Sequence, residues 1–344
     1  MKKQTICKKI GVLVLLLGMF ACSSDESYKS LPDNPLMDLA IPTDFPALND
    51  AVVKNRPTKY GVELGEKLFF DPRLSRDNTI SCSSCHIQAS AYADHQTQAV
   101  GIEGRVGLRN VPPIQNLAFM QYYNWDGSKR QLENQVIVPI ITPEEMHASV
   151  VDIIAKIEGD HTYQILFTKT FGDAQITPER IYQSIAQYEY TLISANSKYD
   201  QVKRKEASFT PLEKNGYALF QVHCASCHSG ALFTDQTFRN IGFPLNPDSN
   251  EAGRARVTGN LNDYMSFRVP TLRNIEFTAP YGSFGQFETL EEVLDYMDQG
   301  VLDAPNLDPI FKENENRIPL TSSEKEALVA FMKTLSDAGF IGHE

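Results

Sequence analysis

Cys82-Ser-Ser-Cys85-His86 and Cys224-Ala-Ser-Cys227-His228 are two copies of one C-x-x-C-H pattern, and the rest of the chain is arranged around them. Two thiols three residues apart can add to the two vinyl groups of one haem, and the adjacent His can bind its iron. A C-x-x-C pair also occurs in short disulfides and in zinc sites, where two pairs would supply four ligands. Because both pairs end in His, the residues favour two c-type haems over structural zinc or two disulfides.

The first residues have the three-part layout of an export signal. Basic MKKQTICKKI is followed by the apolar run GVLVLLLGMF, and Ala21 precedes Cys22. This run has about half the length that a bilayer crossing requires. We therefore predict a lipoprotein signal peptide at 1–21, with lipidation of Cys22; a plain secretory signal with an incidental Cys is the alternative. Residues 22–50, polar and dotted with proline, are predicted to be the lipidated N-terminus and a flexible tether, so membrane attachment is expected by lipid alone.

Composition limits the partners. The chain has 344 residues, of which 42% are hydrophobic, enough for a folded core. It carries 43 acidic and 32 basic residues, a formal net charge of −11, and removal of the four lysines in the signal brings the charge near −15. Such a surface repels polyanions, which excludes nucleic acid as a partner, and it attracts basic proteins.

The pattern around each motif is also duplicated. A stretch with helical spacing, YGVELGEKLFF, precedes the first motif, and a capping box at Thr210 begins a helix before the second. Further helices are predicted from the apolar spacing of 150–157 and after Thr177 and Thr321, and no long alternating pattern predicts a strand. The sequence thus predicts a mainly α fold of two class I cytochrome c-like domains, 51–200 and 201–344, each with one covalent c-type haem. The aperiodic stretch 197–208 is expected to join them.

The residue on the other side of each iron decides whether it is closed or open to small molecules. After the cap at Thr289, Met297 lies on the apolar face of a predicted helix and is the candidate ligand for the second haem, although a Met on such a face is more often core filler. Met265 and Met332 are less well-placed rivals. For the first haem, spacing does not choose among five candidates: His95, Met120, Met146, His147 and His161.

Segments throughout the mature chain resemble the bacterial di-haem cytochrome c peroxidase family, which also includes MauG-like enzymes. They are LGEKLFFDPRLSRDNTISCSSCH, RNVPPIQN, NWDGS, PEEMH, CASCHSGALFTD, VPTLRNIEFTAPYG and TLEEVL. The resemblance implies two cytochrome c domains, with a peroxidatic haem in the first and an electron-supplying haem in the second. It also implies a calcium ion between them.

The resemblance implies roles for individual positions. His86 and His228 match the proximal ligands, and Trp125, the only Trp of the chain, matches the tryptophan between the haems. Glu145 and Gln135 match the distal acid and a distal glutamine. The calcium ligands are matched by one side chain and two backbone carbonyls: Asn110, Thr278 and Pro280.

Two positions bear on the subtype, and one further segment departs from the relatives. Met297 stands where peroxidases have a methionine ligand and MauG-like enzymes have a tyrosine, which favours a peroxidase. Ile102 stands where many relatives have a distal His that blocks the first iron, so we expect a five-coordinate first haem, with His95 as the first replacement ligand to suspect. Gly282-Ser283-Phe284 replaces a segment that commonly contains His in relatives.

Together with the predicted export signal and the anchor at Cys22, the resemblance implies a periplasmic enzyme that reduces hydrogen peroxide to water. An external donor such as a small cytochrome c or a cupredoxin would supply the electrons, and a homodimer is common in the family. The rivals are a MauG-like oxidase that acts on a protein side chain and a di-haem electron carrier without a substrate.

Overall fold

The computed structural model describes residues 33–244 and 251–342. The predicted signal peptide, Cys22 and the first part of the predicted tether lie outside these residues. Within the two described ranges, no helix is both long enough and apolar enough to span a membrane.

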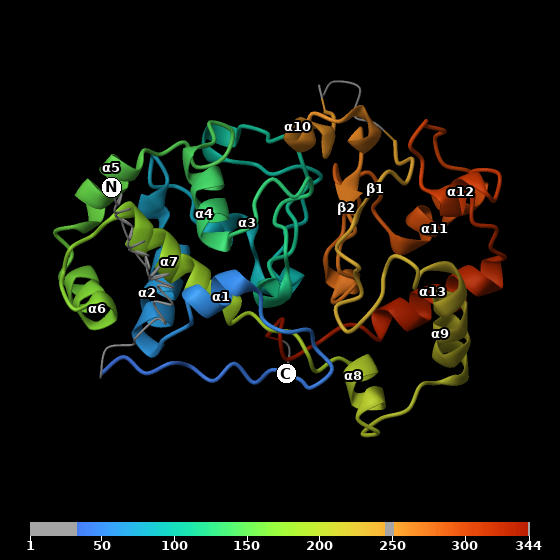
Figure 1. Ribbon diagram of the computed structural model, residues 1–344, viewed down its shortest axis with the longest axis horizontal. Coiled ribbons are helices and arrows are strands. Elements are labelled where there is room, and N and C mark those ends of the chain that lie inside the picture. Colours follow the sequence, from blue (N-terminus) through green and yellow to red (C-terminus); the bar gives the residue numbers. More distant parts are fainter. Residues whose placement is uncertain (1–32, 245–250, 343–344) are drawn as a thin grey trace, which may run out of the picture.

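The described chain is mainly helical, as predicted (Figure 1). Helices that precede residue 204 are α1 Asp50–Lys54, α2 Lys59–Phe69, α3 Cys82–Cys85, α4 Leu132–Ile141, α5 Val150–Ile157, α6 His161–Phe171, α7 Pro178–Tyr190 and α8 Lys198–Lys203. Helices that follow are α9 Pro211–His223, α10 Ala255–Thr258, α11 Leu290–Gln299, α12 Pro309–Lys312 and α13 Ser322–Lys333. The strands β1 Phe238–Arg239 and β2 Phe267–Arg268 pair antiparallel.

The predicted helix starts are confirmed by their caps. Thr210 and Thr321 form complete capping boxes with the glutamates three residues later, and the side chains of Ser149 and Thr177 cap α5 and α7. Thr289 caps α11, but the Glu292 carboxylate accepts from the backbone of Glu288 instead of closing the box.

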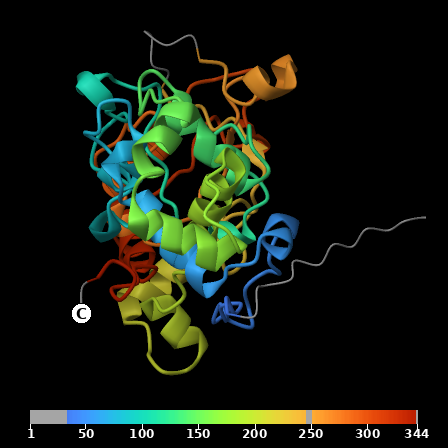
Figure 2. The same cartoon turned by 90° about the vertical axis from the view of Figure 1, so that its left-hand side faces the viewer.

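Two hydrophobic cores lie side by side along the long axis of the molecule, and each contains one crossing of two helices (Figure 1). In the N-terminal core, a Cβ atom at Gly65 of α2 would lie 1.9 Å from the Ser184 carbonyl oxygen of α7. In the C-terminal core, a Cβ atom at Gly216 of α9 would lie 1.9 Å from the Ala327 carbonyl oxygen of α13. Both helices that precede a motif thus use glycine for close backbone contact. Seen from the N-terminal end, the green helices α4–α7 cover the first core (Figure 2).

The stretch predicted as an aperiodic link contains the helix α8. Ser197 and Asp200 form its capping box, and Asp200 accepts two bonds from the fully buried Arg273, of 2.9 and 2.8 Å. The predicted boundary between residues 200 and 201 therefore falls inside a helix. The buried partner of Asp200 lies 73 residues further along the chain, so the local sequence does not indicate this contact.

The predicted tether also ends earlier than residue 50. Asn34 is fully buried and donates to the Thr58 hydroxyl at 3.0 Å, and Phe45 packs edge-to-face on Phe119 in the N-terminal core. Asn34 and Phe45 thus anchor this otherwise mostly exposed stretch on the helical body. The polar composition of this stretch concealed these two anchors.

A buried polar network joins the two halves. The Asp337 carboxylate accepts from the Ser194 hydroxyl at 3.1 Å and from two backbone N–H groups, of Ala195 and Asn196. Asn274 donates to the same Ser194 hydroxyl at 2.9 Å, and its side-chain oxygen accepts from the backbone N–H of Asp337. Because the side chains of Ser194, Asn274 and Asp337 are buried, this network fixes the contact between the two halves.

Candidate functional site

The first C-x-x-C-H motif opens onto a cavity of about 610 Å³, called here the first cavity. The predicted site residues on its wall are Cys82, Cys85, His86, Asn110, Trp125, Gln135 and Glu145. These residues come from α3, α4 and the loops around them. The structure thus brings together residues that lie up to 63 positions apart in the sequence.

The His86 ring is held in one orientation. Its Nδ1 lies 2.7 Å from the carbonyl oxygen of Tyr92. A carbonyl only accepts hydrogen bonds, so Nδ1 carries the proton and Nε2 keeps the lone pair that can bind a metal. Burial lowers the pKa of His86, which favours this neutral ring.

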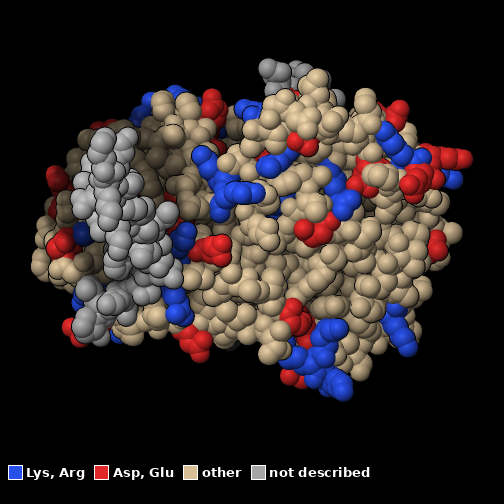
Figure 3. All heavy atoms as spheres, in the orientation of Figure 1, with Lys and Arg blue, Asp and Glu red and all other residues tan. Residues whose placement is uncertain are grey.

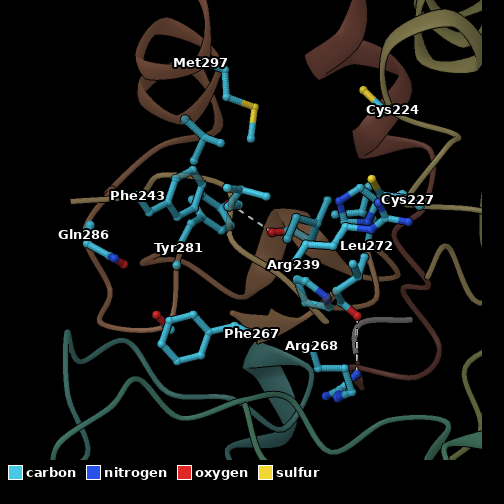
Figure 4. A pocket seen from close by; sticks show the side chains of 18 of the residues that line it. Cys224, Cys227, Arg239, Phe243, Phe267, Arg268, Leu272, Tyr281, Gln286 and Met297 are labelled. Carbon is cyan, nitrogen blue, oxygen red and sulfur yellow. Dashed lines mark hydrogen bonds between the residues drawn. The ribbon is translucent and has the colours of Figure 1, made fainter. Parts of the chain in front are cut away.

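The second motif opens onto a smaller cavity of about 230 Å³, called here the second cavity (Figure 4). The predicted site residues on its wall are Cys224, Cys227, His228, Met297, Asn110, Trp125, Thr278 and Pro280. Figure 4 shows the Met297 side chain extending from its helix into the cavity, with both cysteines on the neighbouring wall. His228 repeats the arrangement of His86, with Nδ1 3.2 Å from the carbonyl oxygen of Phe233.

The two cavities share a wall, formed by the four residues Asn110, Pro113, Trp125 and Arg268. The indole Nε1 of Trp125 donates to the Asn110 carbonyl at 2.9 Å, which fixes the ring plane. The backbone N–H of Arg268 in β2 donates to the Trp125 carbonyl at 2.7 Å. The wall is therefore built from both halves of the chain.

The acid predicted from PEEMH points into the first cavity. Burial, with a smaller contribution from the charge of neighbouring Glu144, raises the pKa of Glu145 to about 7. A carboxyl with this pKa can take up and return a proton near neutral pH. Gln135 lines the same cavity from α4, and its Nε2 donates to the Asn124 side chain at 3.3 Å.

The cavities fit the predicted haems better than the alternatives. All four cysteines of the motifs are free in the described structure, and burial raises the pKa of each thiol, which disfavours the thiolate that zinc requires. Nowhere in 33–244 and 251–342 do three His, Cys, Asp or Glu side chains gather as a metal site would need. Zinc bound by both pairs together is therefore wrong.

Most candidates for a sixth ligand at the first motif lie elsewhere. Only Met146 lines the first cavity; the other four, His95, Met120, His147 and His161, do not. The His95 Nε2 instead lies 2.8 Å from the Ser90 hydroxyl. Ile102 is buried outside the cavity, and its backbone N–H donates to the Glu145 carbonyl at 2.9 Å. At the second motif, Met265, Met297 and Met332 all line the cavity.

The predicted calcium positions lie together on the second cavity. The Asn110 side chain donates to the Gln96 carbonyl at 2.9 Å, and its backbone N–H donates to the Ser283 carbonyl. Phe284 packs edge-to-face on Phe267 beside them, with the ring centroids 5.8 Å apart. The segment that departs from the relatives thus closes this side of the cavity with an aromatic ring.

Two charged residues of the first cavity were missed by the sequence analysis. Glu189 of α7 has one carboxyl oxygen buried without a hydrogen-bond partner, and burial raises its pKa to about 8. The Nε of Arg268 is likewise buried without a partner. Glu189 stands in an amphipathic helix with no motif around it, and Arg268 directly precedes the family-resembling segment VPTLRNIEFTAPYG without belonging to it, so neither residue type by itself indicates a site.

Comparison with known proteins gives a consistent result. Residues 59–208 match the family described as di-haem cytochrome c peroxidase. The chain is 36% identical to the cytochrome c551 peroxidase of Nitrosomonas europaea, over 80% of this chain and 79% of that protein. It is 35% identical to the methylamine utilization protein MauG of Methylorubrum extorquens, over 82% of this chain and 79% of that protein.

A solved structure is similar throughout. It is the crystal structure of a MauG-like protein associated with microbial copper homeostasis, with a TM-score of 0.80 and 30% identity, covering 89% of this chain and 97% of that one. Sequence similarity on this scale, over both motifs and both cavities, identifies the family. The chain therefore belongs to the di-haem cytochrome c peroxidase family of oxidoreductases, which implies two c-type haems.

Proposed function

We propose that this protein is a periplasmic peroxidase that reduces hydrogen peroxide to water with electrons from an external donor. Residues 51–200 would hold the peroxidatic haem, and 201–344 the haem that supplies electrons. The observation that carries the proposal is the first cavity, whose wall includes His86, Glu145, Gln135 and Trp125. The two halves of the reaction, proton handling and electron supply, thus have separate places in the fold.

The proton chemistry is assigned to Glu145. When bound, a haem held by His86 would supply the iron that activates peroxide and would pass on the electrons of the donor. Glu145 would take the proton from one peroxide oxygen and return it to the oxygen that leaves, so that water departs instead of hydroxide. Gln135 orients the peroxide by a hydrogen bond. Two electrons and two further protons complete the conversion of one peroxide to two waters.

Trp125 is assigned the electron path between the cavities. It lines both, and the bond to Asn110 keeps its ring in place. A rigid aromatic side chain needs little reorganisation when an electron passes. The donor would deliver electrons at the second haem, bound by His228 and Met297.

The choice of peroxidase over a MauG-like oxidase rests on Met297. A thioether ligand raises the potential of a haem relative to a harder oxygen ligand, which suits a haem that passes donor electrons onward. Exchange of Met297 for Tyr is expected to lower the potential of the second haem, whereas exchange of Met265 or Met332 for Leu leaves it near that of the unchanged protein. Spectroelectrochemical titration of the purified protein measures the potential of the second haem. A lower potential in the Met265 variant, with no change in the Met297 variant, would assign the ligand role to Met265.

The first haem is proposed to be five-coordinate without prior reduction. Ile102 lies outside the cavity and carries no ligand atom, and His95 is bonded to Ser90. We expect a high-spin electron paramagnetic resonance signal from one haem of the fully oxidised protein. A spectrum with low-spin iron at both sites would contradict this, and Met146→Leu would then show whether Met146 is the ligand.

The remaining assignments follow from the sequence. We propose a lipid anchor at Cys22, calcium bound by Asn110, Thr278 and Pro280, and a small basic cytochrome c or a cupredoxin as donor. The overall charge supports a basic partner, although the face in Figure 3 carries both signs, with basic side chains over α8 at its lower edge. A homodimer, common among relatives, is the proposed assembly.

One experiment separates the three functions. The reduced protein is mixed with one equivalent of peroxide in a stopped-flow spectrometer, in the presence of a reduced small cytochrome c. A peroxidase oxidises the cytochrome catalytically. A MauG-like oxidase reacts with peroxide but leaves the cytochrome reduced and modifies a protein partner, and a plain carrier shows no rapid reaction with peroxide.

A further inference from the structure

Arg268 occupies an unusual position between the two cavities. It belongs to β2, in the C-terminal half, yet it lines the first cavity as well as the second. In Figure 4 its side chain extends from the strand toward the ribbon of the N-terminal half. The guanidinium thus approaches the first cavity from the opposite half of the molecule.

The charge of Arg268 has no counter-ion among the described residues. Its Nε is buried without a hydrogen-bond partner, and Nη1 makes one long bond of 3.5 Å to the Val269 carbonyl. Neighbouring arginines differ: Arg109 pairs with Asp126 and Glu251, and Arg239 pairs with Asp235 and Asp308. Burial lowers the pKa of Arg268 to about 10, and the largest compensating charge is that of a tyrosine, Tyr123.

A buried cation without an anion is costly, so proteins pair such groups or leave them in water. Among the buried side-chain atoms of the described residues that lack a hydrogen-bond partner, one other lies on the wall of the first cavity, a carboxyl oxygen of Glu189, but burial raises the pKa of Glu189 to about 8, so it is mostly neutral at pH 7. The haem that the family implies brings two propionate carboxylates into this space. A planar guanidinium suits such a carboxylate because it can donate two parallel hydrogen bonds.

We propose that Arg268 is the cationic partner of a propionate of the haem attached at Cys82 and Cys85. A residue of the C-terminal half would then hold the haem of the N-terminal half, next to Trp125, to which β2 is already bonded. A fixed cation beside the haem stabilises its reduced state, which carries one positive charge fewer than the oxidised state. Arg268 therefore raises the potential of the first haem. The proposal rests on the two haems of the family and not on the peroxidase activity.

The test compares two neutral variants, Arg268→Gln and Arg268→Met, with a matched control. Arg256→Gln removes the same charge from the wall of the same cavity, but the Arg256 side chain is 49% exposed and solvent screens it. Haem content is measured by pyridine haemochrome, haem potentials by spectroelectrochemistry and thermal stability by circular dichroism. At a fixed applied potential, we expect the reduced-to-oxidised ratio of the first haem to fall about tenfold in Arg268→Gln, a shift of about 59 mV. Arg256→Gln should change it little.

Each outcome decides the proposal. A lower potential at the first haem and a lower melting temperature in Arg268→Met support it. A potential no different from that of the control overturns it, as does a higher melting temperature, because removal of a truly unpaired buried charge stabilises a protein. If both neutral variants lose the first haem, Arg268→Lys decides: haem retained with the positive charge supports the pairing, and haem lost in all three variants assigns the residue to packing alone.

Discussion

Replacement of Glu145 by Gln is expected to lower kcat/KM for hydrogen peroxide by about a hundredfold or more, because general acid–base catalysis contributes about that much. Gln has the shape of Glu but cannot take up the peroxide proton. Glu144→Gln is the matched control, since Glu144 precedes it, carries the same charge and is exposed. Steady-state turnover with a reduced small cytochrome c measures both variants. Full activity in Glu145→Gln would remove Glu145 from the proton path.

The pH profile gives an independent check on the same residue. Burial raises the pKa of Glu145 to about 7, and the carboxylate is the form that accepts a proton. Below pH 7 the carboxylate fraction falls about tenfold for each pH unit, so kcat/KM of the unchanged protein should fall in proportion. The Glu145→Gln variant should lose this slope. A slope that persists in the variant would assign the titration to another group.

Exchange of Trp125 for Phe is expected to slow electron transfer between the haems by about tenfold or more, equivalent to ~1.4 kcal/mol on the barrier. Phe is smaller and cannot make the bond from Nε1 to the Asn110 carbonyl, so the shared wall loses both its ring and its anchor. Peroxide should still react at the first haem. Stopped-flow traces at the two haems separate these steps.

Tyr122→Phe is the control for Trp125, because Tyr122 lies three residues away and lines neither cavity. It should leave both phases unchanged. Equal inter-haem rates in Trp125→Phe and the unchanged protein would exclude the indole from the path. Electrons would then pass through another part of the shared wall.

Much of the local structure follows from the sequence. The two C-x-x-C-H motifs predict where the cavities form, and the threonine caps predict the starts of α7, α9, α11 and α13. These signals are short-range, since a cap or a C-x-x-C pair acts within one helical turn. Long-range contacts within the predicted tether and link carry no such local signal. The sequence around Asn34 and Asp200 is polar, but both side chains are buried and make hydrogen bonds with distant residues, Thr58 and Arg273.

The sequence by itself therefore determined the attachment motifs, the helices that carry them and, through resemblance, the family. Only the tertiary structure decided which side chains face each cavity: that Glu145 and Gln135 share the cavity of His86, that His95 does not, and that Arg268 reaches it from the other half. Periodicity and capping depend on neighbours in the chain. The state of a buried charge depends on partners brought near by folding, and these have no fixed spacing in the sequence.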